Sequence, residues 1–263
     1  MQFKNIFQIC VTNVFSKRIT PKSIIMKKLL FSLLTLATLN SFAQDAVMND
    51  ANAEKRTLSG SFSAIKVSDG IDLFLSQGNE ESLAVSASDP KYMERFKTEV
   101  SNGVLKIYYD NSTMVWNNND RRKLKAYVSF KMLEKLQASS GASVNAKSVL
   151  NLAYLEMHFS SGAEFNGDVK IGELNVDQNS GSQINITGST DKIKVDLSSG
   201  ALFKGYDLSA EYCEAKASSG GEVRINANKE LAAKASSGGS IRYKGTASIK
   251  DLDVSSGGSV KKS

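Results

Sequence analysis

The sequence has few of the residues that build catalytic and metal sites. Its 263 residues include two cysteines, one histidine and one tryptophan. One histidine and so few cysteines leave no cluster of transition-metal ligands with sensible spacing. Cys10 precedes the apolar N-terminal segment, so Cys213 is the only cysteine in the rest of the chain, and no disulfide can form there. Stability must therefore come from buried apolar side chains and backbone hydrogen bonds.

Motifs of common enzymes are also missing. No Gly-x-x-x-x-Gly-Lys-Ser/Thr phosphate loop occurs, and no Gly-x-Ser-x-Gly nucleophile elbow. His158 alternates with the apolar Met157 and Phe159, which places it on the outward, solvated face of a strand. We therefore predict that the protein is not an enzyme and has no cofactor and no metal site.

The N-terminal 43 residues predict export. Met26-Lys27-Lys28 precedes an apolar run of about 11 residues, which is too short to span a bilayer comfortably. Small residues then precede a cleavage position after Ala43, and we predict a start at Met26, with residues 1–25 an upstream extension. This segment holds six of the 33 basic residues and no acidic ones, so 27 of each sign remain. That balance argues against nucleic acid as a partner.

Seven copies of one four-residue motif occupy the second half of the chain. The motif is Ser/Asn-Ser-Gly followed by a small residue, and successive glycines lie 18 to 21 residues apart. A short period held this closely is typical of a solenoid. The structural corners are predicted at Gly141, Gly162, Gly181, Gly200, Gly220, Gly238 and Gly257.

Apolar residues around each corner predict strands. The third residue after every glycine is apolar, and apolar residues before the glycine alternate with polar ones. Glycine can adopt the positive φ of a tight turn, and the small residue after it leaves room for the next coil. We predict an all-β fold, a β-solenoid with coils of about 19 residues. The serine pairs should stack as rows of hydroxyl groups. Cys213 takes a position held by leucine or isoleucine in neighbouring repeats, and it should be a small buried hydrophobe.

The segment before the repeats is less regular. We predict a flexible leader over 44–56, an N-terminal β region over 57–137 and the repetitive β-helix over 138–263. Gly70 should form a divergent first corner, 83–86 a strand, the residues after Pro90 a helix of about two turns, and 98–109 a hairpin.

Two sets of residues are candidates for ligand contact. Residues 111–123 read as a polar loop that contains Trp116, Arg121 and Arg122, and aromatic and arginine side chains are favoured contact residues. Packing of Trp116 over the coil end is the alternative. Asp177 and Asp196 each lie four residues before a corner glycine, but Lys216 and Lys234 hold that position in later coils. Such alternation is typical of a solvated face.

The corners resemble a known family. Together with the segment Phe62 to Gly78 and the Asn102-Gly103-Val104-Leu105 turn, they are similar to the auto-transporter adhesin "head GIN domain" family of exported Bacteroidetes proteins. The resemblance covers Thr57 to the end and implies a right-handed parallel β-helix with an adhesive role. The triplet that names the family is Gly70-Ile71-Asp72 in this sequence, and we expect the protein to lack the translocating barrel of an auto-transporter.

Three functions are compatible with these features of the sequence. The first is an adhesin-like binding module in the periplasm, at the outer-membrane surface or outside the cell, with a glycan or an envelope protein as partner. The second is a structural protein of the envelope that self-associates through open coil ends. The third is a polysaccharide-active β-helix enzyme that uses Asp177 and Asp196.

Overall fold

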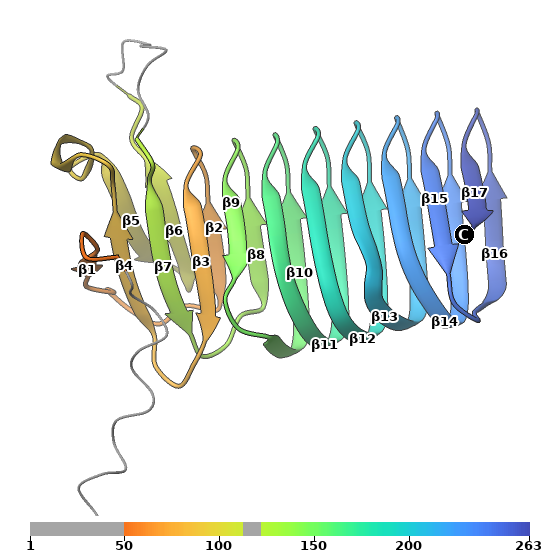
Figure 1. Ribbon diagram of the computed structural model, residues 1–263, viewed down its shortest axis with the longest axis horizontal. Coiled ribbons are helices and arrows are strands. Elements are labelled where there is room, and N and C mark those ends of the chain that lie inside the picture. Colours follow the sequence, from red (N-terminus) through yellow and green to blue (C-terminus); the bar gives the residue numbers. More distant parts are fainter. Residues whose placement is uncertain (1–49, 113–121) are drawn as a thin grey trace, which may run out of the picture. The chain divides into compact units, whose positions relative to one another are not determined.

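The computed structural model describes residues 50–112 and 122–263. The chain divides into two compact units, Met1–Gln44 and Asp45–Ser263. The first unit lies wholly outside the described residues, and so do the predicted signal peptide and its cleavage position after Ala43. The second unit is built almost entirely from β-strands (Figure 1).

The strands fall into an irregular N-terminal part and a regular C-terminal stack. The N-terminal part holds β1 (Glu54–Arg56), β2 (Ala64–Val67), β3 (Asp72–Gln77), β4 (Ser82–Ser86), the 3-10 turn η1 (Pro90–Tyr92), β5 (Phe96–Ser101), β6 (Val104–Tyr109) and β7 (Lys125–Phe130). The stack holds β8 (Lys135–Ala138), β9 (Ser143–Ala146), β10 (Leu150–Phe159), β11 (Glu164–Gln178), β12 (Gln183–Leu197), β13 (Leu202–Ala217), β14 (Glu222–Ala235), β15 (Ser240–Lys244), β16 (Ser248–Val254) and β17 (Ser259–Lys262).

Each coil of the stack runs from one corner to the next. The chain leaves a corner, bends once and returns on the other side, so that β11 to β14 each supply residues to both sides of the rod (Figure 1). We call the side formed by residues after the corners the downstream face, and the side formed by residues before them the upstream face. Neighbouring coils pair in parallel on both, as in Phe165 with Ile184 and Leu174 with Ile193. The predicted solenoid is confirmed.

The core is a column of apolar side chains down the middle of the rod. The predicted core is tested by the residue that lies three positions after each corner glycine. Four of these residues, Val144, Ile184, Val223 and Ile241, have no exposed surface. Val260 in the last coil is partly buried. These columns bury apolar surface that one coil alone could not cover, so stability depends on stacking.

Large and small residues are matched within single coils. Phe165 is followed two positions later by Gly167, and Phe203 by Gly205. A Cβ atom at Gly205 would lie 2.4 Å from Cε1 of Phe203, and one at Gly167 would lie 2.8 Å from Cζ of Phe165. The phenylalanine rings therefore occupy the space that a side chain at the glycine would need. In the coils that carry Ile184 or Val223 in place of phenylalanine, the residue two positions later is isoleucine and not glycine.

The corners are two-residue turns of the I′ type. At Ser140-Gly141 both residues have positive φ, 53° and 72°, and the amide of Ala142 donates to the carbonyl of Ser139. The second serine therefore adopts a conformation that costs a non-glycine residue free energy. Backbone bonding compensates for it, since the amide of Gly141 donates to the carbonyl of Ser161 in the next coil, and six further corners, including the one at Gly70, make the same bond. Among the described residues, no hydrogen bond joins the corner hydroxyls.

The N-terminal part caps the stack with antiparallel strands. Asp69-Gly70 forms the first corner, with φ values of 63° and 68°, and β5 and β6 form the predicted hairpin around Asn102-Gly103. β4 pairs antiparallel with both β7 and β1.

Two local predictions are corrected. The helix after Pro90 is a single 3-10 turn, because Phe96 is buried in β5 opposite Tyr109 instead of continuing the helix. β1 lies inside the predicted leader 44–56, where pairing with β4 gives it regular structure.

The inward side chains are small in two of the later coils. The inward positions before the corners at Gly220 and Gly238 hold Ala215, Ala217, Ala233 and Ala235, where β10 to β12 have larger residues. The residue after the corner glycine is also reduced to glycine, and a Cβ at Gly239 would lie 2.2 Å from the carbonyl oxygen of Ala217. In the last coil, Ile249, Leu252 and Val254 are exposed.

Candidate functional site

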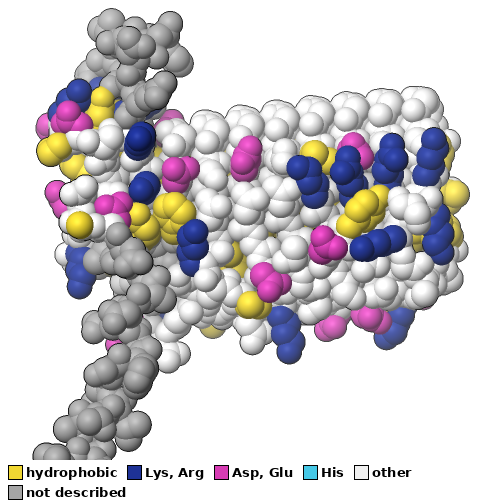
Figure 2. Space-filling view, viewed as in Figure 1, with side chains coloured by type: hydrophobic (Ala, Val, Ile, Leu, Met, Phe, Trp, Pro, Cys, Tyr) yellow, Lys and Arg dark blue, Asp and Glu magenta, His cyan; other side chains and the backbone are white. Residues whose placement is uncertain are grey.

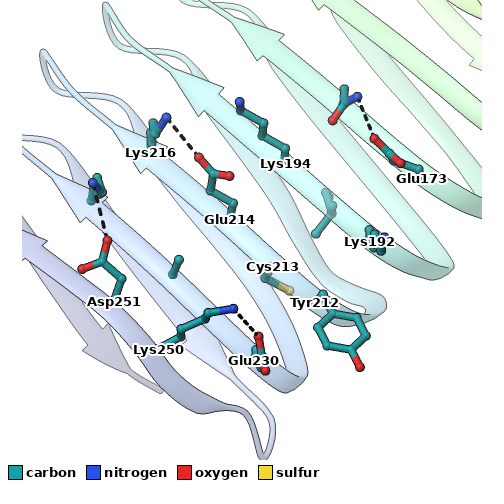
Figure 3. Close-up of a pocket in the computed structure, with 14 residues that line it drawn as sticks. Glu173, Lys192, Lys194, Tyr212, Cys213, Glu214, Lys216, Glu230, Lys250 and Asp251 are labelled. Carbon is teal, nitrogen blue, oxygen red and sulfur yellow. Dashed lines mark hydrogen bonds and ion pairs between the residues drawn. The ribbon is translucent and has the colours of Figure 1, made fainter.

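A groove of about 580 Å³ crosses the upstream face. Its walls come from consecutive coils, from β11 to β14 and β16 (Figure 3). Parallel registration sets the spacing, because Lys194 pairs with Glu214 and Glu214 with Ala232 in neighbouring strands. The small side chain of Ala232 leaves space in the groove, because the residues in register with it in the two neighbouring coils are the larger Glu214 and Asp251.

A one-residue irregularity shapes the C-terminal wall. Leu231 pairs with Ile249 but Ala232 pairs with Asp251, so Lys250 is an extra residue in β16. Its ammonium group lies 3.2 Å from the Glu230 carboxylate, across the groove floor. The sequence period alone would not place Lys250 there.

Most charges in the groove are paired. Lys216 lies 3.0 Å from Glu214, and Lys234 lies 3.5 Å from Asp251 (Figure 3). The hydrogen bond from Lys216 lowers the pKa of Glu214, and the same bond raises the pKa of Lys216. Both groups stay charged at neutral pH, which keeps this side of the groove electrically balanced.

Two lysines and a tyrosine stand apart from these pairs. Lys192 and Lys194 have no ion pair among residues 50–112 and 122–263. Tyr212 follows Lys192 in register and is 42% exposed, and the ammonium of Lys229 lies 5.6 Å from the centre of its ring. An exposed aromatic face beside unpaired ammonium groups can stack on a ring and donate hydrogen bonds to acceptors. This is the part of the groove most suited to a ligand.

Cys213 lies under the groove but points inward. The residue is 5% exposed, and burial raises the pKa of its thiol to about 12. The thiol is therefore uncharged at neutral pH and acts as a small apolar side chain, as predicted.

The predicted contact residues of the polar loop lie elsewhere. Trp116 and Arg121 fall outside the described residues. The Arg122 guanidinium lies 4.4 Å from the centre of the Tyr109 ring and donates to Asn111 at 3.1 Å. Arg122 precedes β7, whereas the groove begins at β11, so the two are separate sites.

The single histidine points outward, as predicted, and lies on the upstream face. The His158 ring hydrogen bonds to Glu156, and its Nδ1 lies 4.0 Å from Asp177. This bond lowers the pKa of Glu156, with a smaller contribution from Lys135. The histidine therefore belongs to a partly exposed charge network.

The acidic row four residues before the corners is interrupted as predicted. Asp177 is in register with Asp196, and the next coils bring Lys216, Lys234 and Asp253 to the same column. No group of three or more potential metal ligands is found in the described part of the chain. Within that part, no helix is long and apolar enough to cross a membrane.

The described residues define a protein of the β-solenoid class, with a groove lined by charged side chains on one face. The match to a family model agrees with this class. Residues 61–247 match the family described as "Putative auto-transporter adhesin, head GIN domain". The chain belongs to this family. A comparison with curated proteins found no match to the sequence.

Solved structures share the fold. A "putative adhesin" from Bacteroides fragilis NCTC 9343 superimposes with a TM-score of 0.72 at 18% identity, covering 80% of this chain and 96% of the other. One from Parabacteroides merdae ATCC 43184 gives 0.65 at 17% identity, with 81% and 97% coverage. A "putative lipid binding protein" from Parabacteroides distasonis ATCC 8503 gives 0.57 at 21% identity, with 81% and 98% coverage. At these identities the likeness concerns the fold alone.

Proposed function

We propose that the protein is an exported, non-enzymatic binding module of the cell envelope or surface, and that it holds a glycan or a surface protein in the groove of the upstream face. The observation that carries this proposal is Tyr212, an exposed aromatic ring next to the unpaired Lys192 and Lys194. Family membership supports an adhesive role, and the predicted signal peptide supports export.

The scaffold suits such a role because its strands fix the groove. Side chains that project from paired strands are held by the backbone ladder, so a ligand need not order a loop when it binds. Sugar rings present an apolar face and several hydroxyls, and these match an aromatic ring flanked by donors.

Binding to a glycan array and to whole cells tests the proposal. We expect Lys192→Ser/Lys194→Ser and, separately, Tyr212→Ser to weaken binding by about tenfold, since each removes one or two direct contacts. Lys97→Ser/Lys170→Ser removes two exposed lysines outside the groove and should leave binding unchanged. An unmodified protein that binds neither array nor cells would refute the binding role. Surface proteolysis of intact cells would show whether the module is exposed.

A second candidate is assembly through the last coil. Ile249, Leu252 and Val254 expose apolar side chains, and the outer edges of β16 and β17 have backbone groups with no strand beside them in the described part of this chain. A second copy could pair with that edge and cover the apolar residues. Light scattering at increasing concentration should then show association that Leu252→Asp abolishes, whereas Lys250→Asp should matter less. A protein that stays monomeric throughout would exclude this candidate.

A further inference from the structure

A column of outward side chains on the downstream face changes character halfway along the rod. The column consists of the residues four positions after each corner glycine, and parallel registration places them one above another. The first three coils carry asparagine, and the Asn185 amide donates to Asn166 at 2.8 Å. The next four carry only cations, which we call the basic row: Lys204, Arg224, Arg242 and Lys261.

The basic row is electrostatically costly. Strands in a sheet are about 4.8 Å apart, and like charges directly opposite each other on neighbouring strands are destabilising. The upstream face avoids this problem at two points, where Asp196 faces Lys216 and Lys234 faces Asp253. The asparagine coils show that a neutral residue fits this column. Folding therefore does not require four successive cations.

Only one acid among the described residues offsets the row. Glu222 accepts from Arg224 at 2.8 Å and lies 3.5 Å from Arg242. Lys204 donates to the neutral Gln183 at 2.6 Å, and Lys261 has no ion pair within the described ranges. The side chains of Arg224 and Arg242 remain 39% and 55% exposed. Figure 2 shows lysine and arginine side chains side by side along this face toward the C-terminal end.

A bulge in β13 borders the row. Residues 206–208 have no partners in β14, and this lets Tyr206 lean along the rod until its hydroxyl lies 2.7 Å from the Ser263 hydroxyl. The ammonium of Lys244 lies 5.6 Å from the Tyr206 ring and 3.7 Å from Asp207. The edge of the row thus presents a fixed aromatic side chain and a fifth cation.

We propose that the basic row binds a linear acidic polysaccharide laid along the axis of the solenoid. One cation per coil matches a polymer with one carboxylate per sugar, because the advance of an extended sugar chain per ring is close to one strand spacing. Ligand carboxylates between the cations would remove the repulsion that the free protein contains. The inference rests on the proposed binding role but uses the face opposite the groove.

The row fits a polysaccharide better than a nucleic acid. A protein that binds single-stranded nucleic acid combines a positive path with aromatic side chains on which successive bases stack. Tyr206 is a single ring, and the neighbouring coils place Asn226 and Lys244 on that side of the row. The chain after residue 43 also has equal numbers of acidic and basic residues, so there is no general excess of positive charge.

Calorimetry with polygalacturonate tests the proposal on the purified protein. We expect binding that weakens as NaCl rises, and affinity for oligogalacturonates that increases up to about four sugars and then levels off. The variant Lys204→Gln/Arg224→Gln/Arg242→Gln/Lys261→Gln should lose about tenfold or more in affinity. Its thermal midpoint should be unchanged or higher, which separates lost binding from lost folding.

A charge-matched variant provides the control. Lys55→Gln/Lys97→Gln/Lys131→Gln/Lys170→Gln removes four exposed cations that lie outside both the groove and the basic row, and it should retain polygalacturonate binding within about threefold. Equal losses in both variants would mean nonspecific charge attraction and would overturn the proposal, and so would the absence of binding or tighter binding to oligo(dT). If cells still bind the basic-row variant normally, the adhesive role stands and this inference fails.

Discussion

Replacing Phe203 by alanine should lower the free energy of unfolding by about 3–5 kcal/mol. The ring is fully buried in the central column, between Ile184 and Val223 of the adjacent coils. The coils on both sides are held by the backbone ladder, so they cannot collapse into the space that the ring leaves. Urea unfolding followed by circular dichroism measures the loss. Met132→Ala, at a residue 59% exposed, should change stability by less than about 0.5 kcal/mol.

The partner glycine gives a sharper form of this test. Gly205→Ile should be strongly destabilising beside Phe203, because even a Cβ atom there would overlap the ring. Phe203→Val/Gly205→Ile reproduces the Val223 and Ile225 arrangement found one coil later, and it should be more stable than Gly205→Ile alone. Additive effects of the two substitutions would show that the ring and the glycine are not coupled.

Gly239→Ala should destabilise the protein by about 3 kcal/mol or more, although it adds a single methyl group. That methyl would lie 2.2 Å from the Ala217 carbonyl oxygen and 2.5 Å from its carbon, and backbone atoms held in a sheet ladder cannot move aside. The coils would have to separate, breaking hydrogen bonds between β14 and β13 or β15.

The adjacent glycine is a matched control for this effect. At Gly238 a Cβ would meet nothing within 4 Å, and only its φ of 76° disfavours alanine. Gly238→Ala should therefore cost about 1 kcal/mol. Equal thermal midpoints for the two variants would show that close packing between the coils at Gly239 does not limit stability.

The repeat pattern predicted most of the fold because each coil repeats the same local rules. Apolar residues three positions after Gly181 and Gly220 identified the core, and Asn102-Gly103 identified a hairpin. What the pattern missed depends on contacts between coils. The positive φ of the second serine at each corner is one example, since the carbonyl of that serine accepts a backbone hydrogen bond from the corner glycine of the preceding coil. The strand at Glu54–Arg56 is another, because it exists only through pairing with β4.

The binding surfaces were predicted less well. The groove arises from the small Ala232 and the extra Lys250, whose effects need the three-dimensional register. The basic row has a signal in the sequence, because Arg224 and Arg242 lie at the same distance after their corner glycines. The acidic residues Asp177 and Asp196 lie before the corners instead, and they pointed to the opposite face of the rod.

The pairing of a phenylalanine with a glycine two positions later affects how whole coils can be added to the solenoid. The large ring of Phe203 is compensated by the missing side chain of Gly205 in the same coil. This coil therefore fills about the same interior volume as the coil with Ile184 and Ile186. Duplicating a whole coil would therefore lengthen the rod by about 4.8 Å without altering its cross-section. Evolution can adjust the reach of the molecule in these steps, and each added coil can extend a column such as the basic row by one charge.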